Sequence, residues 1–183
     1  MELRMLKFIL MLISIASLYA SNSSYPPDDG SDHYNTTAAA VNGEVEQAPE
    51  FTLYTLDGTE IKLSDYLGKI VILDFWATWC APCRKSIPDL ISIQDEYEDE
   101  LVVIGISLDQ PATQNNLQLF INNFGINYPV VLCTYEVSEA YGNIQAIPTS
   151  FIIDKEGNII NKHIGLVPKS TLIEEINSLL AED

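Results

Sequence analysis

Residues 70–83 read IVILDFWATWCAPC, an apolar run that leads into a Cys-x-x-Cys pair. The apolar part, residues 70–75, has the length and composition of a buried central strand. Cys80 and Cys83 follow where a helix would begin, and the free N–H groups and positive end of a helix favour a thiolate. Two thiols at this spacing can also close a small disulfide ring. The stretch therefore predicts a strand that delivers a dithiol pair to a helix N-terminus, the geometry of thiol–disulfide exchange.

The two cysteines are predicted to have different roles. Cys80 lies at the expected helix cap, and such a position lowers a cysteine pKa from its usual value of about 8.5. We therefore expect Cys80 to be the attacking thiolate. Cys83 would occupy the third helical position, mostly covered, and is expected to resolve the mixed disulfide. A zinc site would need a further Cys or His pair, and His33 and His163 have no ligand spacing, so neither a metal nor an organic cofactor is expected.

Asp74 interrupts the apolar strand with a carboxyl group. Burying a charged carboxylate is costly, so desolvation should raise the pKa of Asp74 unless hydrogen-bond donors surround it. A carboxyl group that titrates near neutral pH could accept the proton of Cys83 during resolution. The alternative is a polar edge position or one solvated by a channel, without a catalytic part.

The motif and its surroundings resemble the TlpA/ResA-like extracytoplasmic thiol-disulfide oxidoreductases of the thioredoxin superfamily. Residues 75–83 are similar to the active-site run of that family, and Pro88 to the proline that kinks its first active-site helix. The Ile-Pro-Thr sequence at residues 147–149 is similar to its cis-proline loop. The resemblance, which covers roughly residues 48–180, implies a three-layer α/β/α sandwich with a mixed central sheet and an extra N-terminal β-hairpin.

The resemblance also implies further site residues. Pro148 would form a cis bond opposite the thiols, and Ile147 would present its backbone to an extended substrate peptide, with Thr149 in the same loop. Trp79 would form an exposed shoulder that contacts substrate. The alternatives are an ordinary loop proline at Pro148 and a core aromatic at Trp79.

The patterns in the rest of the chain predict alternating strands and helices, which favours parallel crossover connections. Period-two segments and a turn dipeptide predict the hairpin over residues 51–63. The predicted later strands cover residues 101–108, 128–132, 149–153 and 159–163, and the predicted helices cover residues 82–97, 114–124, 137–141 and 168–180.

The N-terminus has a different composition from the rest of the chain. Residues 1–20 carry two basic residues and then an uncharged apolar stretch that is short for a bilayer span of about 20 residues, which predicts a signal peptide cleaved near Ala20; a retained membrane anchor is the alternative. Residues 21–47 are polar and predict a flexible tether, and residues 48–183 form the predicted thioredoxin-like domain. Asn22 and Asn35 fit the N-glycosylation pattern, which such a composition also produces by chance.

The net charge of the chain and its predicted export both limit which partners the protein is expected to bind. The formal net charge of −17 argues against nucleic acid and anionic membrane surfaces as ligands. An exported enzyme of this kind would act outside the cytoplasm, in the periplasm or at the cell surface, secreted or tethered to the membrane. If it works as a reductase there, it needs an external source of electrons, so we expect a membrane electron donor as a partner.

We therefore predict an extracytoplasmic enzyme that exchanges disulfides with protein dithiol or disulfide substrates through its Cys-Ala-Pro-Cys pair. One alternative is a thiol peroxidase of a related fold, which is disfavoured because Ala77 stands three residues before Cys80, where peroxidases carry threonine. Another is a module that binds client proteins without turning them over. Cys133 is the odd cysteine, and a small buried residue is favoured there over a reactive third thiol.

Overall fold

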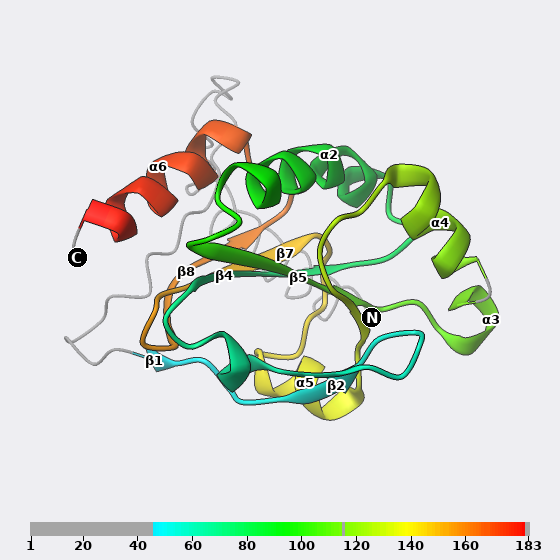
Figure 1. The fold of residues 1–183 in the computed structure, drawn as a ribbon. Coiled ribbons are helices and arrows are strands. Elements are labelled where there is room, and N and C mark those ends of the chain that lie inside the picture. Colours follow the sequence, from blue (N-terminus) through cyan, green and yellow to red (C-terminus); the bar gives the residue numbers. More distant parts are fainter. Residues whose placement is uncertain (1–45, 115, 182–183) are drawn as a thin grey trace, which may run out of the picture. The chain divides into compact units, whose positions relative to one another are not determined.

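The computed structural model describes residues 46–114 and 116–181 (Figure 1). The predicted signal segment, Asn22, Asn35 and His33 lie outside these residues, as does most of the predicted tether. The last two residues of that tether, Glu46–Gln47, form the short strand β1, which pairs with the late strand β8. Within the described residues, no helix is both long enough and apolar enough to cross a bilayer.

A six-stranded mixed sheet forms the centre of the domain, with the strand order β1-β8-β7-β4-β5-β6. β4 pairs in parallel with β5, and β5 with β6, whereas β7 and β8 run antiparallel to their neighbours. The predicted mixed sheet is thus confirmed. Its larger strands are β4 (Ile70–Trp76), β5 (Leu101–Ser107), β6 (Val130–Leu132), β7 (Thr149–Ile153) and β8 (Asn158–Ile164).

β4 is central because both of its faces are apolar. All seven of its residues are buried, and successive side chains point to opposite sides of the sheet. Ile70, Ile72 and Trp76 belong to one hydrophobic cluster, and residues 71, 73 and 75 to another. Asp74 follows the alternation of the first set, so it faces the same side as Trp76.

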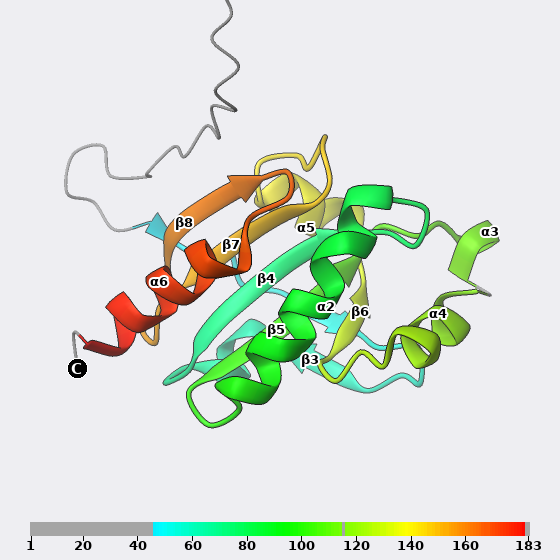
Figure 2. The same ribbon diagram turned by 90° about the horizontal axis from the view of Figure 1, so that it is seen from above.

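Helices cover the face of the sheet that carries Ile70, Ile72 and Trp76, which we call the first face (Figures 1 and 2). A layer of helices and a hairpin covers the opposite, second face. The first layer contains α2 (Ala81–Glu96), α4 (Leu117–Phe124) and α6 (Lys169–Ala181). On the second face lie the 3-10 helix η1 (Leu63–Tyr66), α5 (Tyr135–Ala140), and the hairpin of β2 (Thr52–Tyr54) and β3 (Glu60–Lys62). The predicted three-layer sandwich and its extra hairpin are confirmed.

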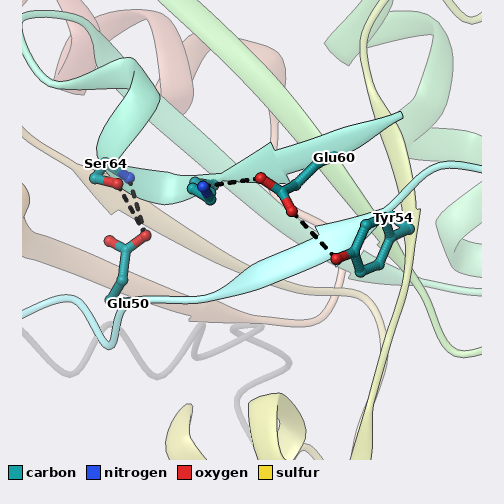
Figure 3. A network of polar contacts seen from close by, with 5 residues as sticks. Glu50, Tyr54, Glu60 and Ser64 are labelled. Carbon is teal, nitrogen blue, oxygen red and sulfur yellow. Dashed lines mark hydrogen bonds and ion pairs between the residues drawn. The ribbon is translucent and has the colours of Figure 1, made fainter. Parts of the chain in front are cut away.

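Polar contacts on the solvent side accompany the apolar packing of the hairpin (Figure 3). Tyr54 donates a hydrogen bond to Glu60 across the two strands, at 3.1 Å. The Ser64 amide and hydroxyl groups donate to Glu50 at 3.3 and 3.1 Å. These exposed contacts add little stability, so the hairpin is held mainly by Phe51, Leu53 and Leu63 in the second cluster.

One predicted helix differs from the structure. The pattern over residues 114–124 predicts a single helix, but Gln114 ends the separate short helix α3 (Pro111–Gln114), and α4 begins at Leu117. Asn116, which has a low helix propensity, stands before α4. The sequence pattern missed this break because the apolar stripe starts only at Leu117.

Candidate redox site

The site is built on the junction between β4 and α2. Cys80 is the N-cap of α2, and its sulfur accepts a hydrogen bond from the Cys83 amide at 3.2 Å. Cys83 is the third residue of the helix, as predicted, and the two cysteines form a disulfide. Cys80 is 4% exposed, whereas Cys83 is fully buried. The arrangement places Cys80 on the outer side of the pair and Cys83 beneath it.

The loop before β7 lies against the outer cysteine. The Ile147–Pro148 bond is cis, and the Ile147 carbonyl oxygen lies 3.6 Å from the Cys80 sulfur. The Gly165 amide donates to the Pro148 carbonyl at 2.8 Å, which ties the loop to the end of β8. Thr149 is buried, and its hydroxyl donates to the Ala146 carbonyl at 2.8 Å. The Thr149 side chain therefore stabilises the loop from inside rather than facing solvent.

Asp74 is almost completely buried in the middle of β4. One carboxyl oxygen accepts a hydrogen bond from the Ser150 hydroxyl at 2.8 Å, and the other has no partner among the described residues. Burial raises the pKa of Asp74 to about 7, and the hydrogen bond from Ser150 offsets part of that rise. Asp74 is thus poised to exchange a proton near neutral pH, on the sheet face that also packs against Cys83.

An open cavity of about 670 Å³ lies beside the exposed indole of Trp79. Trp79 is 62% exposed and Tyr135 is 72% exposed, so two aromatic rings border this cavity. Cys133 is a half-buried free thiol in its wall, and burial raises the pKa of Cys133 to about 11. At neutral pH Cys133 is therefore a neutral thiol with low nucleophilicity.

Asp109 is a site residue that the sequence analysis missed. It is 4% exposed, and it accepts hydrogen bonds from the Thr78 amide at 2.9 Å and the Thr78 hydroxyl at 2.7 Å. Ser107 donates a third hydrogen bond, at 2.9 Å. A signal was present, because Asp109 directly follows a strand predicted to be buried, and the carboxyl ends of parallel neighbouring strands meet at one edge of a sheet.

The other titratable groups that the structure describes do not form a metal site. Among residues 46–114 and 116–181, no group of three or more His, Cys, Asp or Glu side chains is placed to hold an ion. His163 instead pairs with Glu175 of α6 at 3.0 Å.

Comparisons with known proteins agree with this geometry. The AhpC/TSA family model matches residues 45–162. Thiol-disulfide oxidoreductase ResA from Bacillus thuringiensis is 37% identical over 128 residues, which are 69% of this chain and 73% of the relative.

Solved structures of thioredoxin-like proteins are also similar to this chain. A thioredoxin-family thiol:disulfide interchange protein from Chlorobium tepidum is 32% identical with a TM-score of 0.70, over 76% of this chain and 99% of the other. The pneumococcal exposed lipoprotein thioredoxin Etrx1 from Streptococcus pneumoniae is 31% identical with a TM-score of 0.63, over 72% and 100% of the two chains. The chain therefore belongs to the AhpC/TSA family, as a thioredoxin-like thiol-disulfide oxidoreductase.

Proposed function

We propose that this enzyme exchanges disulfides with protein substrates through Cys80 and Cys83, outside the cytoplasm. The observation that carries the proposal is the disulfide at the N-terminus of α2, where the Cys83 amide contacts the Cys80 sulfur. A thiolate at that position would be stabilised by the same amide and by the positive helix end.

The reaction follows from the positions of the two sulfurs. In the reduced enzyme the Cys80 thiolate attacks a substrate disulfide, which forms a mixed disulfide and releases one substrate thiolate. Cys83 then loses its proton and attacks the Cys80 sulfur, which releases the second substrate thiolate. The substrate gains two electrons, and the enzyme returns to the Cys80–Cys83 disulfide seen in the structure. Reversal of these steps would oxidise a substrate dithiol.

Asp74 is proposed to accept the proton that Cys83 gives up. Its pKa of about 7 and its unpartnered oxygen support this role. A group with that pKa is half ionised at neutral pH, where it can both take and return a proton. Cys80 is activated separately by the helix end, so Asp74 would act on resolution and not on attack.

Substrate docking is proposed to involve Trp79 and the loop of Ile147 and Pro148. The exposed Trp79 ring supports contact with a client chain. The Ile147 carbonyl, 3.6 Å from the Cys80 sulfur, supports alignment of an extended peptide beside the attacking atom. Thr149 would contribute by holding this loop through its hydrogen bond to Ala146.

An extracytoplasmic location implies an external electron source, and we propose a membrane electron donor that reduces the disulfide. Export or tethering would depend on residues 1–20. The similarity to a solved protein described as an exposed lipoprotein supports this location.

A three-way comparison of activities tests the function. The reduced protein should catalyse insulin reduction by dithiothreitol and should consume hydrogen peroxide no faster than free thiols do. Cys80→Ser should abolish insulin reduction, and Cys83→Ser should accumulate mixed disulfides with client proteins. Peroxide turnover without insulin reduction would favour the peroxidase alternative, and inactivity in both assays with clients still bound would favour a binding module.

Cys133 provides a matched control among the cysteines. Because its thiol is neutral at pH 7, Cys133→Ala should retain insulin reduction within about threefold of the parent. A Cys133 disulfide in the oxidised protein, or loss of turnover in this variant, would contradict the two-cysteine mechanism.

Rapid-mixing kinetics test the role of Asp74. Asp74→Asn should slow the resolution of a preformed mixed disulfide at pH 7 by about a hundredfold, the lower end of the range for general acid–base catalysis. The formation of the mixed disulfide should keep the parental rate. Equal resolution rates in both proteins from pH 6 to 9 would leave Asp74 without a catalytic part.

A further inference from the structure

Asp109 binds the short segment that presents Cys80. One of its carboxyl oxygens accepts from the Thr78 hydroxyl at 2.7 Å, and the other accepts from the Thr78 amide at 2.9 Å. The second oxygen also accepts from the Ser107 hydroxyl, and that hydroxyl in turn accepts from the Asp109 amide at 3.2 Å. Thr78 is therefore held through both its backbone and its side chain.

Thr78 is a corner of the turn that ends in the attacking cysteine. The Cys80 amide donates to the Ala77 carbonyl at 3.1 Å, so residues 77–80 form one turn with Thr78 and Trp79 at its centre. Ala77 is fully buried, whereas Trp79 is exposed. Asp109 thus holds Thr78, which lies between them.

The base from which Asp109 acts is rigid. The strand that leads to Asp109, β5, ends at Ser107; it is buried along its whole length and pairs with β4 up to Trp76 and Ser107. Directly beyond that pair, the Leu108 amide donates to the Trp76 carbonyl at 2.8 Å. Asp109 therefore connects a stationary strand end to the turn.

We propose that Asp109 is a positioning residue that keeps the Cys80 sulfur over the helix N-terminus once the disulfide is reduced. In the oxidised enzyme the bond to Cys83 also restrains the Cys80 sulfur. Reduction breaks that bond, and the hydrogen bonds from Thr78 to Asp109 then fix the turn that places the thiolate near the Cys83 amide. The proposal rests on the proposed function, because it assigns a role to the reduced form.

Asp109 could influence Cys80 by holding the turn or through its charge, and these two effects predict opposite changes in Cys80 alkylation when Asp109 is replaced. An acidic group near a thiol disfavours the thiolate, so removing the charge alone would lower the pKa of Cys80 and speed its alkylation at pH 7. Loss of position moves the sulfur off the helix end, which raises the pKa of Cys80 and slows alkylation. The direction of the change therefore separates the two effects.

The experiment measures iodoacetamide alkylation of Cys80 against pH in the fully reduced protein, with the modified cysteine identified by mass spectrometry. Asp109→Ala and Asp109→Asn are compared with Thr78→Val, which keeps the carboxyl group and removes only the hydroxyl donor. We expect Asp109→Ala to slow alkylation at pH 7 by about threefold to tenfold and to raise the apparent pKa of Cys80. Thr78→Val should change both in the same direction by less, and Thr78→Ser should restore the parental values.

Asp154→Asn is the matched control. Asp154 also binds a turn, through the Glu156 and Asn158 amides and the Asn158 side chain, at the end of β7 away from Pro148. The Asp154→Asn substitution should leave Cys80 alkylation unchanged even if it makes the protein less stable.

Two results would overturn the proposal: faster alkylation in both Asp109 variants, or a lower melting temperature with the Cys80 rate unchanged. If Asp109→Ala does not fold, Thr78→Val alone decides, and a parental alkylation profile in that variant would reject the proposal. Failure of the proposed function differs from these results, because the parent protein itself would then lack insulin reduction.

Discussion

Asp74 and Asp109 both carry buried carboxyl groups, one within β4 and one just beyond the end of the neighbouring strand β5, yet they differ in their hydrogen-bond donors. Asp74, in the interior of β4, receives one hydrogen bond and keeps one oxygen without a partner among the described residues. Asp109, just past the end of β5, receives three hydrogen bonds from Thr78 and Ser107. Both residues are almost completely buried, so the number of hydrogen-bond donors is what distinguishes their surroundings.

The backbone around each residue explains the difference. Inside β4, the amide groups are used by the sheet, since Asp74 lies between Gly105 of β5 and Ser150 of β7 in the register. Gly105 has no side chain and Ser150 has a single hydroxyl, so these two flanking residues offer Asp74 one side-chain donor. Beyond the strand ends, the Thr78 amide is not part of a ladder and can donate to a side chain.

The largest expected effect is on stability at Asp74. Its pKa rises from 3.8 to about 7 on folding, so between these values the unfolded carboxyl is ionised while the folded one stays protonated. The unfolded state then binds fewer protons, and the free energy of unfolding of the parent falls with pH by about 4 kcal/mol in all. Asp74→Asn removes this loss. Its stability relative to the parent should therefore increase from pH 4 to 7 and stay constant above pH 7.

Urea unfolding at pH 4.5 and pH 8 measures this change. An unpaired amide proton at position 74 lowers the gain at every pH by a similar amount, so the difference between the two pH values is the quantity to compare. The same relative stability at both pH values would contradict a raised pKa of Asp74.

Asp109→Ala should lower the free energy of unfolding, whereas Asp74→Asn should raise it relative to the parent as the pH rises. The Asp109→Ala substitution leaves the Thr78 amide and the hydroxyls of Thr78 and Ser107 without their acceptor, which should cost about 3 kcal/mol because unpaired buried donors are expensive. Chemical unfolding of the parent and the variant at pH 8 gives the value. A loss below the measurement error would show that water replaces Asp109, and the contrast with Asp74 would disappear.

Gly105→Ala tests the crowding beside Asp74. A methyl group on Gly105 would lie 2.8 Å from the Trp76 indole nitrogen and 3.3 Å from the Tyr128 ring. Trp76 is fully buried and has little room to move, so we expect a loss of about 2 kcal/mol from overpacking. In the Trp76→Phe background the same change should cost less, and equal costs in both backgrounds would show that Trp76 is not the obstacle.

The smallest effect is expected at Ser150. Its hydroxyl is the one donor that lowers the pKa of Asp74. Ser150→Ala should therefore raise that pKa above about 7 and reduce stability by about 1 kcal/mol. Carboxyl titration by NMR reports the pKa directly, with Thr149→Ser as a neighbouring control. A lower pKa would mean that solvent enters the space left by the hydroxyl.

Much of the fold could be predicted from the sequence because its strands are long apolar runs and its helices carry apolar stripes. The hairpin, β4, α2 and the closing helix all occur where their patterns predict them. The break between α3 and α4 did not follow, because local propensity at Asn116 competes with an apolar pattern that begins at the next residue. Boundaries of this kind depend on small energy differences within one turn.

Some features of the site depend on residues that are close together in the sequence, and others depend on residues that are far apart. Residues 70–83 by themselves determined the dithiol pair, its order on the helix and an isolated carboxyl in an apolar strand, since all three depend on near neighbours in the sequence. The family resemblance already implied that the loop of Ile147 faces the thiols. Tertiary structure alone decided that Ser150 is the donor to Asp74 and that Asp109 holds Thr78. These partners are 76 and 31 residues apart. They meet only because the strand register of β4 with β5 and β7 places them together, and such a register is set by the packing of the whole sheet.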